Sequence, residues 1–390
     1  MMLMILFFAC LFLFIHTYLL FPLTLPMFAE FFQRRHKHSA PFSEADFLPK
    51  VSLLISAYNE EAVIEKKIQN CLELDYPPEL LQILIGNDGS QDRTAEIIRK
   101  YASRVTLVDA EKNQGKAAML NQLAKNATGE VLLFCDANTL FFPNVVRKIA
   151  QPFQETRMGC VCGHLILSDQ SGSALGEGES AYWDLESEIK KFEGLAGVVI
   201  GGNGAIYAIR SSLFTPLPTN RSVMDDFFVT VKVLQKGYQS TFISSAIGTE
   251  QTSKAGMGEF KRKIRIGRAN FNYLQAYLPL LNPLHPLVAY FFLSHKLLRW
   301  VSPHLAILLV VSNLFLLPHH PFFQLTFVGI ILLFILGGLG AFVRGNGKIS
   351  SVLHSTYYFL TMNYALLRGS MQALLPERGG GWTRIERGDE

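Results

Sequence analysis

Short apolar runs alternate with helical patterns through the first part of the chain, and this alternation constrains the fold most strongly. The runs are Val51–Ser56, Leu81–Ile85, Val105–Val108 and Val131–Cys135. Each is as short as a buried strand and is bounded by polar or turn residues. Helical patterns lie between them at 64–72, 95–101 and 116–125. Strands that alternate with helices predict right-handed crossovers, and therefore an α/β fold with a mostly parallel sheet.

Polar side chains follow three of these strands at the point where each strand ends. Asn59 and Glu60 follow the first strand, Asp88 follows the second, and Asp136 and Asn138 follow the fourth. A turn or a helix cap explains each of them alone. Because the carboxyl ends of parallel strands meet at one edge of a sheet, the three together predict a ligand-binding crevice there.

Asp136 and Asn138 stand two residues apart, directly after a buried run. Residues two apart on an extended backbone point to the same face, so both oxygens can face one divalent cation. Mg²⁺ and Mn²⁺ accept carboxylate and amide oxygens and commonly carry a diphosphate. The same two residues also suit a capped turn, and the tripeptide alone does not separate these interpretations.

The hydrophobic content of 49% is concentrated at the two ends of the chain. Leu3–Leu20 is almost unbroken in its apolar character and is long enough to span a bilayer. A basic cluster begins at Arg34, and basic residues beside a span mark its cytoplasmic side. A signal peptide is the weaker interpretation, because no basic segment precedes the span and no small-residue cleavage site follows it. We therefore expect the amino terminus outside and the body of the chain in the cytoplasm.

Further membrane segments are expected after residue 283. Leu287–Trp300 contains His295, Lys296 and Arg299 among apolar residues, which suits a helix in the membrane interface. Spans are expected at about 303–317 and 322–343, whereas the polar residues of 352–375 favour an interfacial or protein-packed helix. The expected organisation is a transmembrane helix at 1–31, a basic linker at 32–50, a cytoplasmic domain at 51–282, interfacial and transmembrane helices at 283–375, and a cytoplasmic tail at 376–390.

Charge and cysteine content exclude some classes of function. The net charge of +4 is too small to indicate nucleic-acid binding, and the basic residues cluster beside the membrane segments. Cys160 and Cys162 are too close for an ordinary disulfide and have no partner pair for zinc. We expect the cysteines to be structural.

Six motifs occur in the order and spacing of glycosyltransferase family 2. They are SAYNE at 56–60, NDGS at 87–90, NQGK at 113–116, DAN at 136–138, GGNGAIYAIR at 201–210 and MDDF at 224–227. The central domain resembles this family along its whole length. The membrane segments resemble its polysaccharide-synthase branch, which includes hyaluronan, cellulose, chitin and poly-N-acetylglucosamine synthases. The resemblance implies the nucleotide-sugar-binding fold called GT-A, flanked by transmembrane and interfacial helices, and a transfer that inverts the anomeric centre.

The resemblance also implies roles for the matching residues. Asp88 would read the base of a UDP-sugar, and Asp136 with Asn138 would hold Mg²⁺ or Mn²⁺. In the family the second metal-binding residue is an acid, so Asn138 is expected to weaken metal binding. The implied donor-binding residues are Ala57, Tyr58, Asn59, Glu60, Asp88, Lys116, Asp136, Arg265 and Arg268.

Asp226 corresponds to the general base of the family. An inverting transfer needs one carboxylate to take the proton of the acceptor hydroxyl while that oxygen attacks the anomeric carbon. For the acceptor we expect contacts with Gly202 and Gly204, with Asp225, and with the ring of Trp183. Aromatic residues at helical spacing are more often part of a core, so a packing role for Trp183 stays open.

A basic segment at 261–268 is expected to stabilise the leaving diphosphate. Arg265 and Arg268 are three residues apart and share a helix face, so both can bind phosphate oxygens. Lys261 and Lys263 are expected to be solvated or to face the membrane surface. Processive relatives carry a Gln-x-x-Arg-Trp motif here, and Ile266 stands at the position of its Trp.

The resemblance and the apolar segments together imply an inverting hexosyltransferase embedded in a membrane. It would move a sugar from a UDP-sugar to a saccharide or lipid-linked acceptor in polysaccharide or glycoconjugate synthesis. A polysaccharide synthase and an enzyme that adds one sugar to a lipid carrier or lipid both remain open. A non-catalytic membrane subunit of a synthase is the alternative from another class. The expected location is the bacterial inner or plasma membrane with the catalytic domain in the cytoplasm, and partner subunits of an export or synthesis complex are possible.

Overall fold

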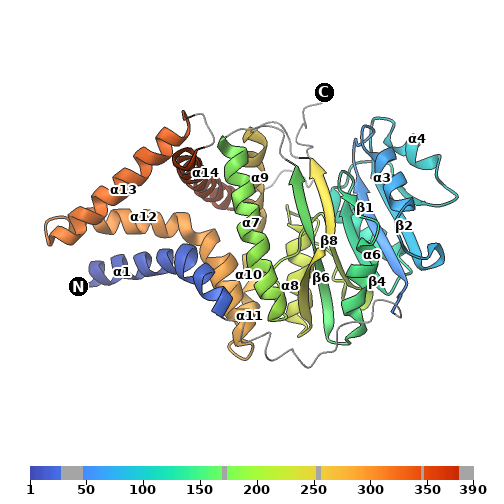
Figure 1. Cartoon of the computed structure of the whole chain (residues 1–390), viewed down its shortest axis with the longest axis horizontal. Helices are drawn as coiled ribbons and strands as arrows, with labels where there is room; N and C mark the ends of the chain where they lie inside the picture. The colour runs from blue at the N-terminus through green and yellow to red at the C-terminus, as the bar shows by residue number, and fades with distance from the viewer. Residues whose placement is uncertain (28–46, 169–173, 252–255, 344–346, 377–390) are drawn as a thin grey trace.

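The computed structural model describes residues 1–27, 47–168, 174–251, 256–343 and 347–376. The basic cluster after the first span, most of the predicted linker and nearly all of the predicted tail lie outside the described residues. An α/β domain forms one end of the molecule, and long helices project from the other end (Figure 1).

Within the described part of the chain, one mixed sheet of eight strands organises the α/β domain, in the order β3-β2-β1-β4-β7-β6-β8-β5. The parallel strands β3, β2, β1 and β4 form one side of it, while β7 runs antiparallel to both β4 and β6. The four strands predicted from the sequence are these parallel ones, so the prediction of a mostly parallel α/β sheet is confirmed. The strands are β1 (Val51–Ala57), β2 (Leu81–Asp88), β3 (Thr106–Ala110), β4 (Val131–Asp136), β5 (Leu140–Phe141), β6 (Met158–Ser168), β7 (Tyr207–Arg210) and β8 (Gln239–Gln251).

Both faces of the sheet are buried, which explains why its strands are continuous apolar runs rather than alternating ones. In β4, Leu132 and Phe134 belong to one core cluster, and Leu133 belongs to the other. Helix α5 (Lys116–Asn126) covers the first face, together with α8 (Asp225–Gln235). The second face is covered by α3 (Ile64–Leu72), α4 (Thr94–Arg99) and α6 (Val145–Ala150).

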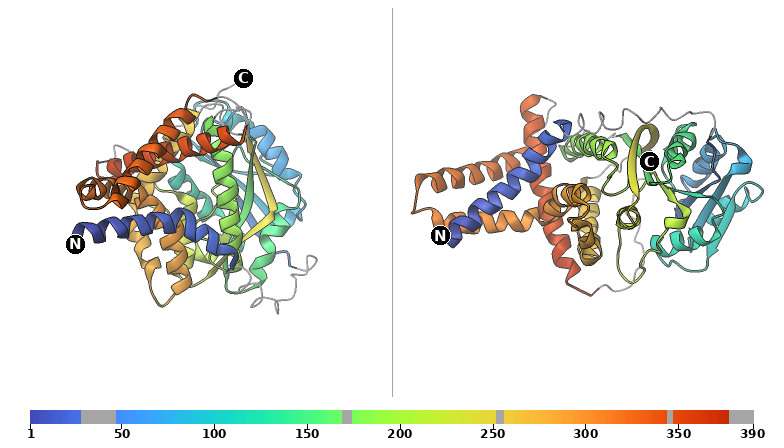
Figure 2. Two further views of the ribbon diagram at one scale, coloured as in Figure 1. Left: turned by 60° about the vertical axis from the view of Figure 1, so that its left-hand side comes forward. Right: turned by 90° about the horizontal axis from the view of Figure 1, so that it is seen from below.

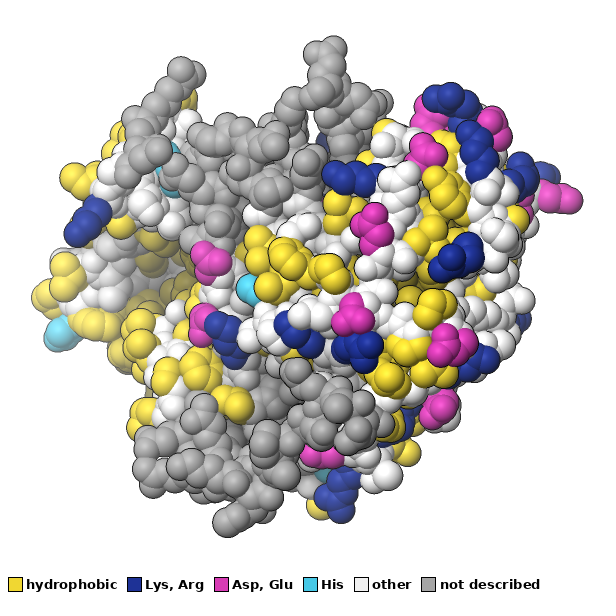
Figure 3. All heavy atoms as spheres, turned by 45° about the vertical axis from the view of Figure 1, so that its right-hand side comes forward, with side chains coloured by type: hydrophobic (Ala, Val, Ile, Leu, Met, Phe, Trp, Pro, Cys, Tyr) yellow, Lys and Arg dark blue, Asp and Glu magenta, His cyan; other side chains and the backbone are white. Residues whose placement is uncertain are grey.

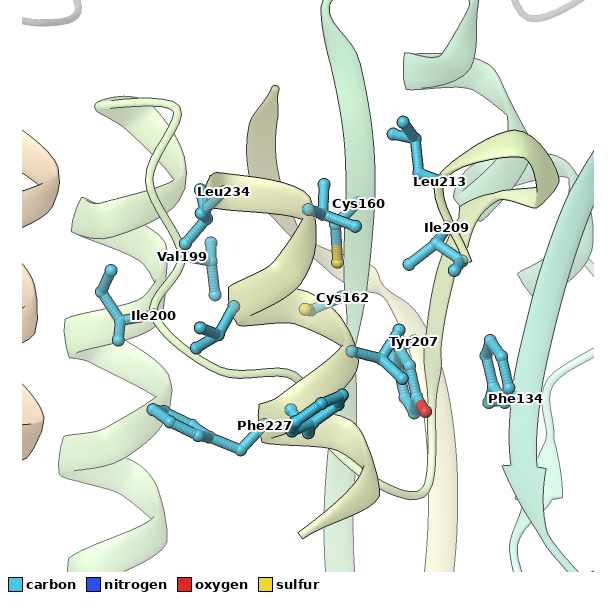
Figure 4. Close-up of a cluster of buried hydrophobic side chains, with 14 of the residues drawn as sticks. Phe134, Cys160, Cys162, Val199, Ile200, Tyr207, Ile209, Leu213, Phe227 and Leu234 are labelled. Carbon is cyan, nitrogen blue, oxygen red and sulfur yellow. The ribbon is translucent and has the colours of Figure 1, made fainter. Parts of the chain in front are cut away.

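Helix α8 is held against the sheet by its apolar face. Phe227 and Leu234 extend from this helix into the cluster that contains Tyr207, whose ring stacks on Phe134 with centroids 4.6 Å apart (Figure 4). This packing fixes the first turn of α8, where Asp225 and Asp226 lie.

Among the described residues, three helices are long and apolar enough to cross a membrane: Met2–Met27, Pro286–Leu316 and Pro321–Gly340. They include α1 (Met2–Ile15), α11 (Pro286–Phe291), α12 (Leu298–Leu316) and α13 (Pro321–Gly340). Both views of Figure 2 show α1, α12 and α13 projecting together away from the sheet. The face in Figure 3 carries interspersed basic and acidic side chains over the α/β domain, whereas apolar side chains dominate its left edge.

The interfacial helix and the span that the sequence separates at Pro303 form one continuous helix in the structure. Proline lacks the N–H that would bind the carbonyl four residues earlier, which is why it was expected to begin a new helix. Here that carbonyl belongs to Arg299, and the Ser302 hydroxyl donates to it at 2.8 Å. The helix therefore continues through Pro303 with its backbone satisfied.

Helix α14 (Lys348–Ala373) packs on α7 (Ala174–Leu195) and α9 (Gly256–Asn272), in agreement with the protein-packed alternative for 352–375. Helices α14 and α9 approach closely at glycines. A Cβ on Gly369 would lie 2.4 Å from the Ile264 carbonyl oxygen and 2.9 Å from the Arg268 nitrogen. Both are backbone atoms, so neither can move aside cheaply.

We expect Gly369→Val to destabilise the protein by about 1–3 kcal/mol, because it forces these two helices apart. Gly338→Ala in α13 is the matched control, since nothing lies within 4 Å of a Cβ at that position. That control should be neutral or slightly stabilising because alanine favours a helix over glycine. Thermal unfolding of the full-length protein in detergent measures both variants, and equal melting temperatures would contradict the packing described here.

Candidate active site

A cavity of about 1590 Å³ lies at the carboxyl edge of the parallel strands and continues toward the long apolar helices. Register places the strand ends level, because Ser56 pairs with Asp136 on one side and with Gly86 on the other. The residues predicted for the site that line this cavity are Tyr58, Glu60, Asp88, Lys116, Asp136, Asn138, Trp183, Gly202, Gly204, Asp225, Asp226, Arg265 and Arg268. Of the predicted residues, Ala57 and Asn59 are not part of its lining.

Asp88 holds the loop that follows β3. Its two carboxylate oxygens accept hydrogen bonds from the backbone N–H groups of Gln114 and Gly115, both at 2.8 Å, and its side chain is almost fully buried. Burial raises the pKa of Asp88, and these two hydrogen bonds partly oppose that effect. The geometry therefore gives Asp88 a positioning role for the Gly115–Lys116 turn, beside the base-reading role that the family resemblance implies.

The loops after β1 and β2 are tied together by hydrogen bonds. Asn59 has a positive φ of 54°, and its side-chain oxygen accepts a hydrogen bond from the Gln91 N–H at 2.8 Å. Its own N–H donates to the Ser90 hydroxyl at 2.9 Å, and the Glu60 N–H donates to Thr94 at 2.9 Å. Asn59 thus shapes the edge of the site without lining the cavity itself.

Lys116 links two acids across the cavity. It begins α5 directly after Gly115, whose φ of 92° favours glycine, and its ammonium lies 2.8 Å from Asp136 Oδ1 and 3.2 Å from Asp225 Oδ2. Burial alone would lower the pKa of Lys116, but the charges of Asp136 and Asp225 raise it above its ordinary value. Lys116 therefore stays cationic at the point where a diphosphate would meet the sheet edge.

Asp226 has the electrostatic setting of a proton acceptor near neutral pH. Its Oδ1 accepts a hydrogen bond from the Phe227 N–H at 2.8 Å. Burial, followed by the neighbouring charge of Asp225, raises the pKa of Asp226 to about 6. A carboxyl group with a pKa just below neutral pH is both ionised and basic under ordinary conditions, as general-base catalysis requires.

The glycine-rich segment after α7 packs tightly beside Asp226. Gly201 has a φ of 91°, and a Cβ there would lie 2.6 Å from the Phe227 ring. A Cβ on Gly204 would lie 3.5 Å from Asp226 Oδ2. A side chain at Gly201 would be strained and would clash with the Phe227 ring, whereas a Cβ at Gly204 would make only ordinary contact with Asp226.

Helix α9 meets α7 through cation–π contacts on one wall of the cavity. The Arg262 guanidinium lies 5.6 Å from the Trp183 ring centroid, and the Lys263 ammonium lies 4.1 Å from that of Tyr182. The expectation of a solvated or membrane-facing Lys263 is wrong, because this side chain is buried against an aromatic ring. Trp183 lines the cavity, and its ring contacts the Arg262 guanidinium and, edge to face, the ring of Tyr182.

The donor atoms at the sheet edge suit a metal that is completed by substrate. Within the described ranges, no group of three or more His, Cys, Asp or Glu side chains is placed to hold a metal ion. Asp136 and Asn138 nevertheless both face the cavity with hard oxygen ligands. Mg²⁺ commonly takes only one or two protein ligands and fills its remaining positions with water and phosphate oxygens. The two residues therefore fit such an ion.

A buried charged cluster where the cavity meets the long apolar helices was not assigned to the site from the sequence. It joins Glu186 and Glu193 of α7 to His295, Lys296 and Arg299 of the long apolar helix. The signal that identifies it is the presence of charged residues within a segment apolar enough to span a bilayer, which marks functional positions. That signal was interpreted instead as a helix at the membrane interface.

The comparison that decides the family is a match of residues 52–211 to the model described as glycosyl transferase family 2. This part of the chain is a family 2 glycosyltransferase domain. The six motifs had predicted this family, and the prediction is confirmed.

Relatives of the family 2 domain include bacterial enzymes. The poly-beta-1,6-N-acetyl-D-glucosamine synthase of Staphylococcus aureus strain COL is 29% identical over 244 residues, which is 60% of this chain and 58% of the relative. The probable glycosyltransferase YdaM of Bacillus subtilis strain 168 is 27% identical over 237 residues, which is 57% of this chain and 56% of the relative. The chain thus matches somewhat more than half of the length of these relatives.

The family 2 domain and its helices also resemble a solved structure. This is the mannosyltransferase PcManGT from Pyrobaculum calidifontis, in complex with GDP-Man and Mn²⁺. The match has a TM-score of 0.63 at 19% identity, and it covers 94% of this chain and all of the other. It confirms the predicted GT-A fold.

Proposed function

We propose that this protein is a membrane-bound inverting glycosyltransferase that moves a sugar from a UDP-sugar to a hydroxyl of a saccharide or lipid-linked acceptor. The observation that carries the proposal is the convergence of Asp136, Lys116, Asp225 and Asp226 in one cavity, at the edge where α/β sheets bind ligands. The family match and the synthase relatives support it. The apolar helices support placement in a membrane. We place the domain on the cytoplasmic side because a basic cluster that begins at Arg34 follows the first apolar segment.

In this proposal each residue of the site has a distinct task. Asp226 accepts the proton of the acceptor hydroxyl while that oxygen attacks the anomeric carbon from the side opposite the diphosphate. Lys116 binds a phosphate oxygen of the donor, and Arg265 and Arg268 stabilise the charge of the leaving diphosphate from the opposite wall. Asp88 keeps Lys116 in place through the loop it holds.

Asp136 and Asn138 would hold Mg²⁺ or Mn²⁺, which when bound supplies charge for the departing diphosphate. In the structure the Lys116 ammonium donates a hydrogen bond to one carboxylate oxygen of Asp136. Lys116 is therefore positioned to share that carboxylate with the ion and to contact the same diphosphate.

The test is nucleotide release by the purified full-length protein. UDP-glucose, UDP-N-acetylglucosamine, UDP-galactose and GDP-mannose are supplied separately with Mn²⁺ or Mg²⁺, and GDP-mannose is included because the PcManGT structure contains it. We expect release of UDP from at least one UDP-sugar. Release from GDP-mannose alone would contradict the proposed donor.

The chain length of the product separates the two acceptor classes that the sequence leaves open. Lipid extraction and mass spectrometry after incubation with the active donor show either a discrete glycolipid or a ladder of long products. We favour assembly of a polysaccharide unit in the broad sense, which includes single additions to a growing chain. A third candidate, a non-catalytic subunit, is disfavoured because Asp88, Asp136 and Asp226 are all present in the cavity.

Asn138→Asp should tighten metal binding by about tenfold, because a second carboxylate adds charge to the ligand set. Mn²⁺ binding measured by electron paramagnetic resonance reports this change independently of catalysis. Asn144→Asp is the matched control, since Asn144 is exposed and is not part of the cavity lining. Equal Mn²⁺ affinity of the wild type and Asn138→Asp would contradict the assigned metal position.

The pH dependence of transfer should report Asp226. Its pKa is raised to about 6, and the base acts only when it is ionised. Transfer should therefore be half-maximal near pH 6, fall about tenfold for each pH unit below about 5, and be nearly constant above about 7. Initial rates at saturating donor, measured from about pH 4.5 to about pH 8 in steps of about half a pH unit, give this profile. A rate that stays constant down to about pH 4.5 would contradict the role of Asp226.

A further inference from the structure

The cavity of the proposed active site continues past the sheet edge to the membrane helices. At one end it is lined by Asp226, and at the other by Tyr18 next to α1, Trp300 of α12, and Phe359 and Met362 of α14. A water-soluble acceptor would use only the polar end. An occupant that fills the whole cavity has one polar part and one apolar part.

Three cationic side chains lie between these two ends. The Lys190 ammonium donates to the Gly202 carbonyl at 3.2 Å. Lys296 forms an ion pair with Glu186, and Arg299 Nη1 lies 3.1 Å from the same carboxylate. The side chains of Lys296 and Arg299 are only 15% and 13% exposed. All three line the cavity.

The cluster carries more positive than negative charge. His295 lies between Glu186 and Glu193, with ring nitrogens 3.0 Å and 2.6 Å from their oxygens. Burial raises the pKa of Glu186, but His295 and Lys296 lower it by more, so it lies well below its ordinary value. Two carboxylates, Glu186 and Glu193, thus stand against three cationic side chains that line the cavity, Lys190, Lys296 and Arg299.

Charged side chains at this position cost free energy, so a purely structural role does not explain them. His295, Lys296 and Arg299 lie on a helix apolar enough to cross a bilayer, where charges are expensive and usually face a cavity or a substrate path. Within the described part of the chain, the buried Nε of Arg299 has no hydrogen-bond partner. An anion with several oxygens would supply that partner and balance the surplus charge.

The glycine-rich segment that contains Gly201, Gly202 and Gly204 connects the cluster to the end of the cavity where Asp226 lies. Lys190 bonds the Gly202 carbonyl, and a Cβ on Gly201 would lie 3.8 Å from Lys296 Cε. The same segment passes Asp226 at Gly204. An anion bound by Lys296 and Arg299 therefore lies beside the segment that borders the proposed base.

We propose that the acceptor is a lipid-linked saccharide, in which a phosphate joins the sugar to a hydrocarbon chain. Lys190, Lys296 and Arg299 bind the phosphate, and the hydrocarbon chain lies against Phe359 and Met362 of α14. A hydroxyl of the acceptor sugar reaches Asp226. This inference rests on the proposed function and specifies its acceptor.

The transfer step balances with these assignments. The acceptor hydroxyl oxygen forms a bond to the anomeric carbon of the donor, and its proton passes to Asp226. The bond from that carbon to the diphosphate breaks, and the nucleoside diphosphate leaves with the electron pair. The acceptor phosphate is an anchor and takes no part in bond formation, so the base and the cations have separate tasks.

Binding of three probes to the wild-type full-length protein tests the proposal. Farnesyl diphosphate has the anion and the chain, farnesol lacks the anion, and inorganic pyrophosphate lacks the chain. The donor site is first saturated with UDP and Mn²⁺, and titrations follow tryptophan fluorescence, because Trp183 and Trp300 line the cavity. We expect farnesyl diphosphate to bind at least about tenfold more tightly than either other probe. Equal affinity of farnesol, or of pyrophosphate, would overturn the proposal.

Variants then test the residues. Arg299→Gln should weaken farnesyl diphosphate about tenfold or more, whereas Arg299→Lys should retain most of the affinity. Arg147→Gln is the matched control, because Arg147 pairs with Asp75 and is not part of the cavity lining. UDP affinity is measured on every variant, which verifies the fold and separates the two proposals. A protein that binds no UDP refutes the proposed function, whereas normal UDP binding with wild-type farnesyl diphosphate affinity in Arg299→Gln refutes this inference alone.

Discussion

Replacing Asp226 with asparagine is expected to reduce sugar transfer by about 10²–10⁴-fold, because the amide cannot accept the proton of the acceptor hydroxyl. The substitution keeps the size of the side chain, and its oxygen can still accept the Phe227 N–H. The fold and the affinity for UDP should therefore be nearly unchanged. Initial rates of UDP release with acceptor, together with equilibrium UDP binding, measure both parts of this expectation.

The matched control for Asp226→Asn is Asp75→Asn. Asp75 is exposed and pairs with Arg147 outside the cavity, so its neutral replacement changes charge by the same amount without touching the site. Its transfer rate should equal that of the wild type. If Asp226→Asn retained the wild-type rate while binding UDP normally, Asp226 would not be the base.

Replacing Asp88 with alanine is expected to have the second largest effect. It leaves the N–H groups of Gln114 and Gly115 without their carboxylate partner, at a cost of about 1–3 kcal/mol for a buried donor. Because that loop leads into Lys116, donor binding should fall as well. Thermal unfolding measures the first effect, and binding of UDP measures the second.

This variant also separates the two roles of Asp88. If Asp88 mainly positions the loop, Asp88→Ala should lower the melting temperature and weaken UDP, GDP and inorganic pyrophosphate alike. If it mainly reads the base, the melting temperature and pyrophosphate binding should hold while UDP alone loses affinity. Its two hydrogen bonds to the backbone lead us to expect the first pattern.

The parallel part of the sheet and the edge of the site were predictable from the sequence, because they depend on local patterns. Each strand of this part is a short apolar run, and the residue after each run is fixed by chain order. Asp88 and Asp136, for example, end β2 and β4 as predicted. Parallel pairing then brings those ends together without further information.

The partners of these side chains were not predictable, because they depend on how loops and helices approach one another. Nothing local indicates that Asp88 would accept two backbone N–H groups from a loop 26 and 27 residues away. Likewise, Lys263 appears solvated in a basic segment until α7 places the ring of Tyr182 beneath it.

The long helix through Pro303 shows the same limit. Proline is a strong local signal for a helix start, yet the Ser302 hydroxyl replaces the missing hydrogen bond and the helix continues. The continuous helix carries His295, Lys296 and Arg299 to the acids of α7. These residues, predicted to lie on a helix in the membrane interface, also form part of the cavity wall.

Because residue 138 is Asn, the site has one carboxylate fewer than the family pattern. We assign the missing stabilisation of the departing diphosphate to cationic side chains. Lys116 at the sheet edge and Arg265 with Arg268 on α9 all line the cavity. Cations of this kind stabilise the charge that develops on a departing diphosphate. The arginines should therefore contribute more to leaving-group departure here than in relatives with two acids.

The anomeric configuration of the product tests the central claim most directly. The purified protein is incubated with an α-linked UDP-sugar and acceptor, and the new linkage is assigned by proton nuclear magnetic resonance. In-line attack by a hydroxyl activated by Asp226, opposite a diphosphate held at Lys116 and Asp136, predicts a β-linked product. An α-linked product, or no transfer from any nucleotide sugar, would contradict the account.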